Sequence, residues 1–158
     1  MIDIDTVQSM LEDIASELPE EFYRELNGGI LLLPKVKRNR LGRGDDLYVM
    51  GEYHNNRSMG RYIVIYYGSF EQLYGHLGPR ALRRRLSHTL KHEFTHHLES
   101  LAGERTLEKK DEEFIRKYLE EVEREEREQA ARDQEEREQA EQEQQQEREQ
   151  QEQQQQQE

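Results

Sequence analysis

The spacing of apolar residues divides the first two thirds of the chain into short helices and strands. Residues 5–18 place apolar side chains at intervals of three and four, with acidic residues between them. This pattern predicts an amphipathic helix that Asp5 caps and Pro19 ends. Residues 20–26 can add a further helical turn. After the break at 27–29, the apolar run 30–33 predicts a buried strand that Pro34 stops.

Two further runs have the composition of strands. Residues 47–53 and 61–67 are rich in β-branched and aromatic side chains, and the polar segment between them ends in Gly60. They therefore predict a β-hairpin. The basic segment 35–46 is expected to be a loop. No aromatic residues alternate with its charges, so we expect no nucleic-acid partner.

A long helix is expected from Pro79 to about Gly103, because proline favours the first turn of a helix and glycine its end. Its apolar stripe consists of Leu82, Leu86, Leu90, Phe94, Leu98 and Leu101. Residues 111–122 carry a second periodic stripe and predict another helix. Three strands with helices segregated from them indicate an α+β fold for a domain at residues 1–122.

Residues 123–158 form a charged low-complexity tail. The hexapeptide Glu-Glu-Arg-Glu-Gln-Ala occurs at 125–130 and again at 135–140, and the tail has no apolar seam for a coiled coil. It is expected to be a solvated single helix or disordered. The net charge of −12 arises at this end of the chain, because residues 1–110 contain 16 basic and 16 acidic residues.

Composition excludes several chemistries. The chain has no cysteine, so disulfides, thiolate metal ligands and a cysteine nucleophile are all excluded. The N-terminus lacks the basic and apolar segments of a signal peptide, and no apolar run has the length of a membrane span. We expect a soluble cytoplasmic protein with no membrane partner.

His92-Glu93-Phe94-Thr95-His96 is an HExxH motif within the predicted long helix. Two histidines four residues apart lie on one side of a helix, so both can bind one metal ion. The intervening Glu93 can act as a general base toward a water molecule. Both histidines lie about 200° around the helix from apolar residues of the stripe, which places them on the opposite face. The alternative is a histidine-rich, solvated helix face.

A catalytic zinc usually has three protein ligands. Glu99 lies on the same face, but about 10 Å along the helix axis from His92, which is too far for shared ligation. A carboxylate after Gly103 is better placed. The candidates are Glu104, Glu108, Asp111 and Glu112, and spacing alone does not choose among them.

The chain resembles the small bacterial zincin-like metallopeptidases, a family with a minimal matrix-metalloprotease-like fold and the pattern HExxHHxGxxD. The matching residues are His92-Glu93, His96-His97, Gly103 and Asp111-Glu112-Glu113-Phe114, together with the strand at 61–67. The similarity covers residues from about 5 to 120, and the spacing on both sides of Gly103 is longer than in the family pattern. The resemblance implies His92, His96 and Asp111 as zinc ligands, with Glu104 in reserve, and Glu93 as general base.

The expected function is zinc-dependent hydrolysis of a peptide or protein substrate. An extended peptide can pair with the 61–67 strand if that strand is a sheet edge. Candidates for stabilising the oxyanion are Tyr66, Tyr67, Tyr74 and His97, and His88 can support the metal site. Two alternatives are a zincin-like module that binds zinc or peptide without turnover, and an interaction protein that acts through its charged C-terminal helix.

Overall fold

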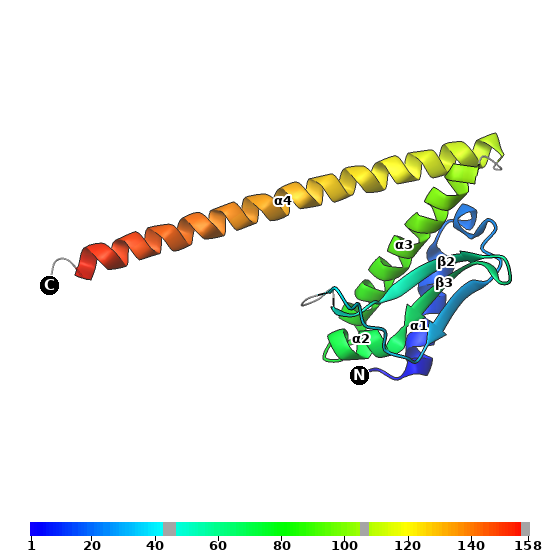
Figure 1. Cartoon of the computed structure of the whole chain (residues 1–158), viewed down its shortest axis with the longest axis horizontal. Helices are drawn as coiled ribbons and strands as arrows, with labels where there is room; N and C mark the ends of the chain where they lie inside the picture. The colour runs from blue at the N-terminus through cyan, green and yellow to red at the C-terminus, as the bar shows by residue number, and fades with distance from the viewer. Residues whose placement is uncertain (43–46, 105–107, 156–158) are drawn as a thin grey trace. The chain divides into compact units, whose positions relative to one another are not determined.

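The computed structural model describes residues 1–42, 47–104 and 108–155 (Figure 1). The chain divides into two compact units, Met1–Ile115 and Arg116–Glu158. The first unit contains a three-stranded mixed sheet and the helices that pack on it, so the expected α+β class is confirmed. No helix within the described part of the chain is both long and apolar enough to cross a membrane.

The N-terminal helix α1 spans Ile4–Glu17 and is followed by a short 3-10 helix, η1, at Glu20–Tyr23. The predicted cap at Asp5 is wrong, because Asp3 caps the helix by accepting a 3.0 Å hydrogen bond from the Thr6 backbone N–H. Asp5 instead lies in the first turn, where its negative charge interacts favourably with the positive end of the helix dipole. The predicted apolar face is buried through Val7, Leu11 and Ile14.

The sheet contains β1 (Gly29–Leu33), β2 (Gly51–Asn56) and β3 (Gly60–Tyr66) in the order β1-β3-β2. The predicted hairpin is confirmed, since β2 pairs antiparallel with β3, and Gly60 has the positive φ of 70° that its turn requires. Before β2, residues 47–50 lie outside any named strand. Tyr48 forms an isolated bridge with Arg38, and the Met50 carbonyl accepts a 2.9 Å hydrogen bond from the Tyr66 N–H at the end of β3. The predicted loop 35–46 includes residues 43–46, which lie outside the described residues.

The hypothesis that the 61–67 strand offers a free sheet edge is wrong. β3 is the central strand, with β1 parallel on one side and β2 antiparallel on the other. Its buried run from Ile63 to Tyr66 reflects this position. The two sheet edges are β1 and β2, and β2 is the edge strand that contacts α3.

Helix α2 (Tyr67–Tyr74) follows β3 directly, and the sequence pattern did not predict it. Its first residue, Tyr67, continues the aromatic end of β3, so the sequence gives no clear sign that the two-residue period of a strand changes to the 3.6-residue period of a helix. Gly68 allows close approach here, because a Cβ atom would lie 2.7 Å from the Pro34 carbonyl oxygen. The turn into α2 is therefore packed against the chain that leaves β1.

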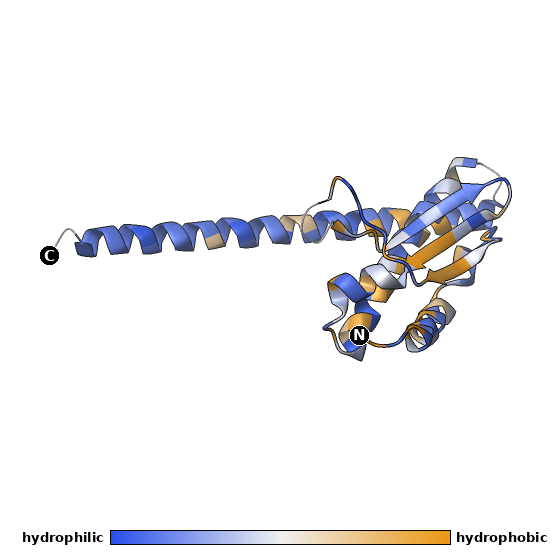
Figure 2. Ribbon diagram, turned by 60° about the horizontal axis from the view of Figure 1, so that its bottom comes forward, coloured by the Kyte–Doolittle hydropathy of each residue, from blue (hydrophilic) through white to orange (hydrophobic). Residues whose placement is uncertain are grey.

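Helix α3 spans Pro79–Glu104 and confirms the predicted long helix. All six members of its apolar stripe are 0% exposed, and the helix packs on β2, β3, α1 and η1. Figure 2 shows the apolar colouring of β1 and β3, which lie in the layer that α3 covers. The helix extends one residue beyond the end predicted at Gly103. Its opposite face is open to solvent.

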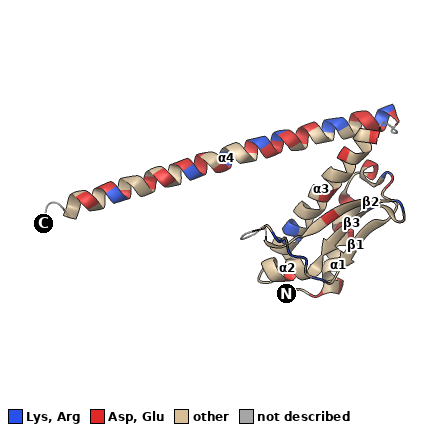
Figure 3. Cartoon of the chain, in the orientation of Figure 1, with Lys and Arg blue, Asp and Glu red and all other residues tan. Residues whose placement is uncertain are grey.

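Helix α4 spans Lys109–Gln155, so of the two alternatives for the tail the helical one holds over its described residues, 123–155. Asp111 and Ile115, the buried residues of α4, belong to the first unit. The second unit is a highly charged helix (Figure 3) supported by local side-chain pairs, such as the 3.0 Å contact of Arg116 with Glu120. The predicted domain boundary at residue 122 falls within α4.

Candidate active site

His92 and His96 project from the exposed face of α3, one helical turn apart. Their Nε2 atoms are 3.2 Å apart and their rings are nearly perpendicular, at 89°. Two nitrogen ligands of a tetrahedral zinc ion, with bonds of about 2.0–2.1 Å, are roughly 3.3 Å apart. The separation of the two nitrogens therefore fits a shared metal ion, although it also fits an N–H···N hydrogen bond.

The second nitrogen of His96 faces an acidic neighbour. Its Nδ1 atom lies 3.7 Å from Oε2 of Glu99, one turn further along the helix. A carboxylate beside the outer nitrogen is the arrangement that orients many metal-binding histidines. At this distance the two exposed side chains form an ion pair when His96 is protonated, but no hydrogen bond from Glu99 fixes the ring.

Glu93 is buried between α3 and β2, with only 6% of the residue exposed. It accepts a hydrogen bond from the backbone N–H of Tyr53, and Gly51 lies against its side chain. A Cβ atom at Gly51 would approach Glu93 Cγ to 3.2 Å. Burial raises the pKa of Glu93, while the charge of His96 lowers it and that of Glu52 raises it.

The predicted third ligands are engaged elsewhere in the first unit. Asp111 forms an ion pair with Arg24, and Glu104 forms one with Arg61. Across residues 1–42, 47–104 and 108–155, no group of three His, Cys, Asp or Glu side chains is arranged to hold a metal ion. The two histidines fit a metal, whereas neither carboxylate is grouped with them, so the third ligand stays a prediction.

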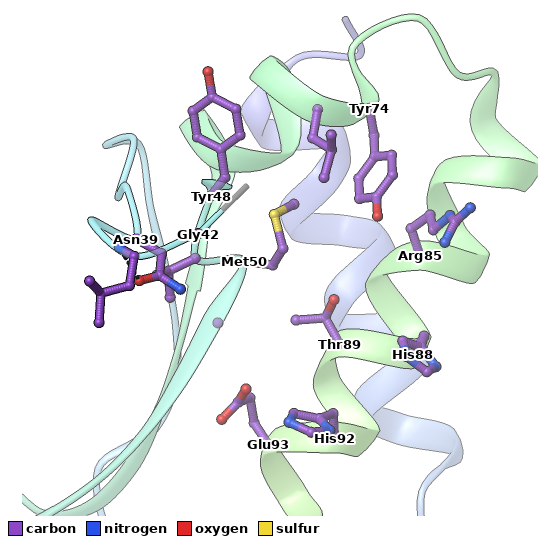
Figure 4. Close-up of a pocket in the computed structure, with 14 residues that line it drawn as sticks. Asn39, Gly42, Tyr48, Met50, Tyr74, Arg85, His88, Thr89, His92 and Glu93 are labelled. Carbon is purple, nitrogen blue, oxygen red and sulfur yellow. Dashed lines mark hydrogen bonds between the residues drawn. The ribbon is translucent and has the colours of Figure 1, made fainter. Parts of the chain in front are cut away.

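A cleft of about 830 Å³ opens beside His92 and Glu93 (Figure 4). One wall is α3, and the other is the segment that leads into β2, while α2 closes the end farthest from Glu93. The lining residues are Asn39, Leu41, Gly42, Tyr48, Val49, Met50, Gly51, Leu73, Tyr74, Arg85, His88, Thr89, His92 and Glu93. The cleft is large enough for side chains of a bound peptide.

The proposed oxyanion residues are not grouped together. Tyr74 lines the cleft, as does His88, the residue expected to support the metal site. Tyr66 is buried and donates to Glu52, and the hydroxyl of Tyr67 donates to the Ile2 carbonyl at 2.8 Å. Of the four candidates, Tyr74 alone lines the cleft.

His97 has a structural environment. It is 0% exposed, with Nε2 2.8 Å from the Arg24 carbonyl oxygen and Nδ1 3.0 Å from the Tyr53 hydroxyl. Because a carbonyl can only accept, Nε2 carries the proton and Nδ1 accepts from tyrosine. Burial lowers the pKa of His97, although the Arg24 carbonyl opposes this shift. The neutral imidazole thus links α3 to η1 and β2.

Sequence reasoning missed several residues of the site. The contacts of Gly51 and of the Tyr53 backbone with Glu93 depend on the packing of β2 on α3, which no sequence pattern indicates. Arg85 had a usable signal, since it precedes His92 by seven residues and therefore lies on the same helix face.

Comparisons with known proteins give a relative but no activity. A solved structure of a conserved hypothetical protein from Thermus thermophilus is similar at 31% sequence identity, with a TM-score of 0.55. The similarity covers 65% of this chain and 99% of the other. The chain belongs to the same family as that protein. No family model matches the chain, and no curated protein matches it either.

Proposed function

We propose that the protein is a zinc-dependent peptidase in which His92 and His96 hold the metal and Glu93 is the general base. The observation that carries this proposal is the 3.2 Å separation of the two Nε2 atoms on the exposed face of α3. Glu93 projects from the same helix into a cleft with room for a peptide. The zincin-like fold implied by the sequence resemblance is part of the proposal.

Each residue has a defined task in this reaction. A bound zinc ion would supply a Lewis acid for the scissile carbonyl and for the attacking water. Glu93 accepts the proton of that water and returns it to the leaving amine. The Tyr53 N–H and the closely packed Gly51 hold the carboxylate of Glu93 in place. Glu99 lies 3.7 Å from the outer nitrogen of His96 and adds a negative charge beside the proposed ligand.

A second candidate function is a module that binds zinc or peptide without turnover. It is favoured by the ion pairs of Asp111 with Arg24 and of Glu104 with Arg61, which occupy both carboxylates expected to complete the metal site. A site with two histidines and no third protein ligand binds metal less tightly than a complete catalytic site.

Metal content tests the binding half of the proposal. The purified full chain, loaded with zinc and desalted, is expected to hold about one zinc ion per molecule by elemental analysis. His92→Ala should abolish this binding, while the exposed His76, which does not line the cleft, provides a matched control in His76→Ala. Equal zinc content in His92→Ala and wild type would contradict the assignment.

Hydrolysis is tested separately. Mass spectrometry of a peptide library should show cleavage by the zinc-loaded protein, reduced about 10² to 10⁴-fold in Glu93→Gln with zinc retained. Glu71→Gln, on the exposed surface of α2, is the control for loss of a carboxylate. Cleavage that survives in Glu93→Gln would exclude Glu93 as the base. A zinc-loaded protein that cleaves nothing would favour the binding module.

A further inference from the structure

The end of the cleft farthest from Glu93 carries a concentration of hydrogen-bond donors. Arg85 and His88 project from consecutive turns of α3, and Tyr74 extends from α2 beside Arg85 (Figure 4). Glu93 is the one carboxylate among the described lining residues. The far end of the cleft is therefore suited to a negatively charged group.

Arg85 is held in place without an acidic partner. Its guanidinium carbon lies 4.9 Å from the centre of the Tyr74 ring, and the ring of Tyr74 packs in turn on Phe70, at 5.8 Å and 47°. Phe70 is 0% exposed, so the arginine is connected to the core through two aromatic rings. Within the described residues, no carboxylate lies at ion-pair distance from Arg85, whereas Arg83 contacts Glu17 at 3.0 Å.

The sequence at this end of α3 also works against helix stability. Four arginines lie within residues 80–85, and the first turn of α3 contains no acidic residue (Figure 3). Cations are disfavoured at the positive end of a helix dipole. Residues that lower the stability of a helix are expected where a function requires them. Arg85 lies beyond this first turn, so the case for an anionic ligand at Arg85 rests on its place in the cleft and on the lack of an acidic partner in the described part of the chain.

We propose that Arg85 selects an acidic side chain of a bound peptide, with Tyr74 orienting the guanidinium and His88 beside it. The inference rests on the proposed function for the nature of the ligand. Seven residues of helix separate Arg85 from His92, about 10 Å along the axis, and an extended peptide advances about 3.3 Å per residue. For a peptide that runs along α3, the selected carboxylate belongs to a residue about three positions from the bond to be cleaved.

A peptide fits these walls better than a nucleic acid does. The cleft combines its cationic end with the apolar side chains of Val49, Met50 and Leu73. Its two tyrosines lie apart, Tyr48 on the segment that leads into β2 and Tyr74 on α2. Nucleic-acid grooves instead combine a track of cations with stacked aromatic platforms. One carboxylate on an otherwise uncharged peptide would suffice to pair with Arg85, whose guanidinium packs on the Tyr74 ring.

Binding to full-length, zinc-loaded Glu93→Gln protein tests the inference without turnover. The probes are fluorescent decapeptides in which one glutamate moves through an otherwise neutral chain, each with a glutamine twin. Fluorescence anisotropy should show about tenfold tighter binding of the glutamate peptide at one position, the size expected for a charge-assisted hydrogen bond. Arg85→Ala in the same background should reduce this ratio to about one.

Matched variants distinguish a specific effect of Arg85 from a general effect of positive charge. Arg84→Ala removes an exposed neighbouring arginine that does not line the cleft, and it should leave the tenfold preference intact. Arg85→Lys should retain only part of the preference, because lysine keeps the charge but lacks the planar fork. Arg85→Glu should favour a lysine peptide over its glutamate twin.

Each outcome decides the question. A glutamate-to-glutamine ratio near one at every position, an unchanged ratio in Arg85→Ala, or no peptide binding at all would overturn the inference. Tighter binding of a fluorescent single-stranded oligonucleotide than of any acidic peptide would also overturn it. If the protein binds acidic peptides selectively but never cleaves them, acid selection by Arg85 is supported and the proposed hydrolysis is rejected. If it cleaves peptides without acid selectivity, hydrolysis is supported and the role of Arg85 is rejected.

Discussion

On one face of α3, six apolar side chains are completely excluded from solvent, while the opposite face exposes Arg85, His88, His92 and His96. The two faces belong to the same 26-residue helix, so they share its backbone and its position on the sheet. Packing of the apolar face on the sheet determines the position of the helix, and the polar face thereby presents its side chains at the cleft. Substitutions on the two faces should therefore separate stability from ligand binding.

The largest effect is expected on the apolar face. Phe94 is 0% exposed, and its ring lies 5.5 Å from that of Phe22 and 5.2 Å from that of Tyr23. Phe94→Ala should lower the free energy of unfolding by about 3–5 kcal/mol, because it leaves a cavity between α3 and η1. Urea denaturation of the metal-free protein measures this loss. A change below about 1 kcal/mol would mean that this layer is not the core.

A smaller effect is expected where the two faces meet β2. In Gly51→Ala the new methyl group would lie 3.0 Å from Thr89 Cγ2 and 3.2 Å from Glu93 Cγ. Overpacking of this kind costs about 1–3 kcal/mol, and here it also displaces the proposed base. Urea denaturation and peptide hydrolysis should both detect it. Gly78→Ala, with open space around the position, is the matched control.

The buried His97 should give stability a pH dependence. Its folded pKa is lowered below the unfolded value of about 6.5, so its contribution is complete above that value and is lost as pH falls toward the folded pKa. His97→Gln should flatten the decline in unfolding free energy below pH 6.5. Denaturation is compared at several pH values in the presence of a chelator. Parallel curves for the two proteins would contradict this assignment.

On the polar face the effect on folding should be small. His92→Ala in the metal-free protein should change the free energy of unfolding by no more than about 0.5 kcal/mol, because the side chain is exposed. Added zinc should raise the melting temperature of wild type and leave that of the variant unchanged. Strong destabilisation without metal would show that His92 belongs to the packing of the domain.

The smallest effect should come from the second unit. It contains local side-chain pairs such as Gln129 with Asp133, at 2.8 Å, each worth a few tenths of a kcal/mol within the helix itself. Deletion of residues 124–158 should reduce the helical circular dichroism signal but leave the melting temperature and zinc binding of the remaining domain unchanged. Loss of zinc binding would move the domain boundary beyond residue 122.

The sequence predicted best what depends on periodicity. The buried stripe of α3 and the opposite placement of His92 and His96 follow from 3.6 residues per turn, and Pro79 and Gly103 indicated its bounds to within one residue. The pairing partners of a strand depend instead on contacts across the whole sheet. For that reason the central position of β3 was missed, and so was the packing of Gly51 on Glu93. The carboxylates after Gly103 could not be ranked, because their ion pairs with Arg24 and Arg61 join distant segments.

The direct passage from β3 into α2 bears on how this protein tolerates changes in length. Strand β3 ends at Tyr66 and α2 begins at Tyr67, with no residue between them to absorb an insertion. One added residue would turn α2 by about 100° about its own axis. Tyr74 would then leave the cleft and lose its contact with Arg85. Insertions in related proteins should therefore accumulate in the loop between β1 and β2 or in the tail, and be absent from this junction.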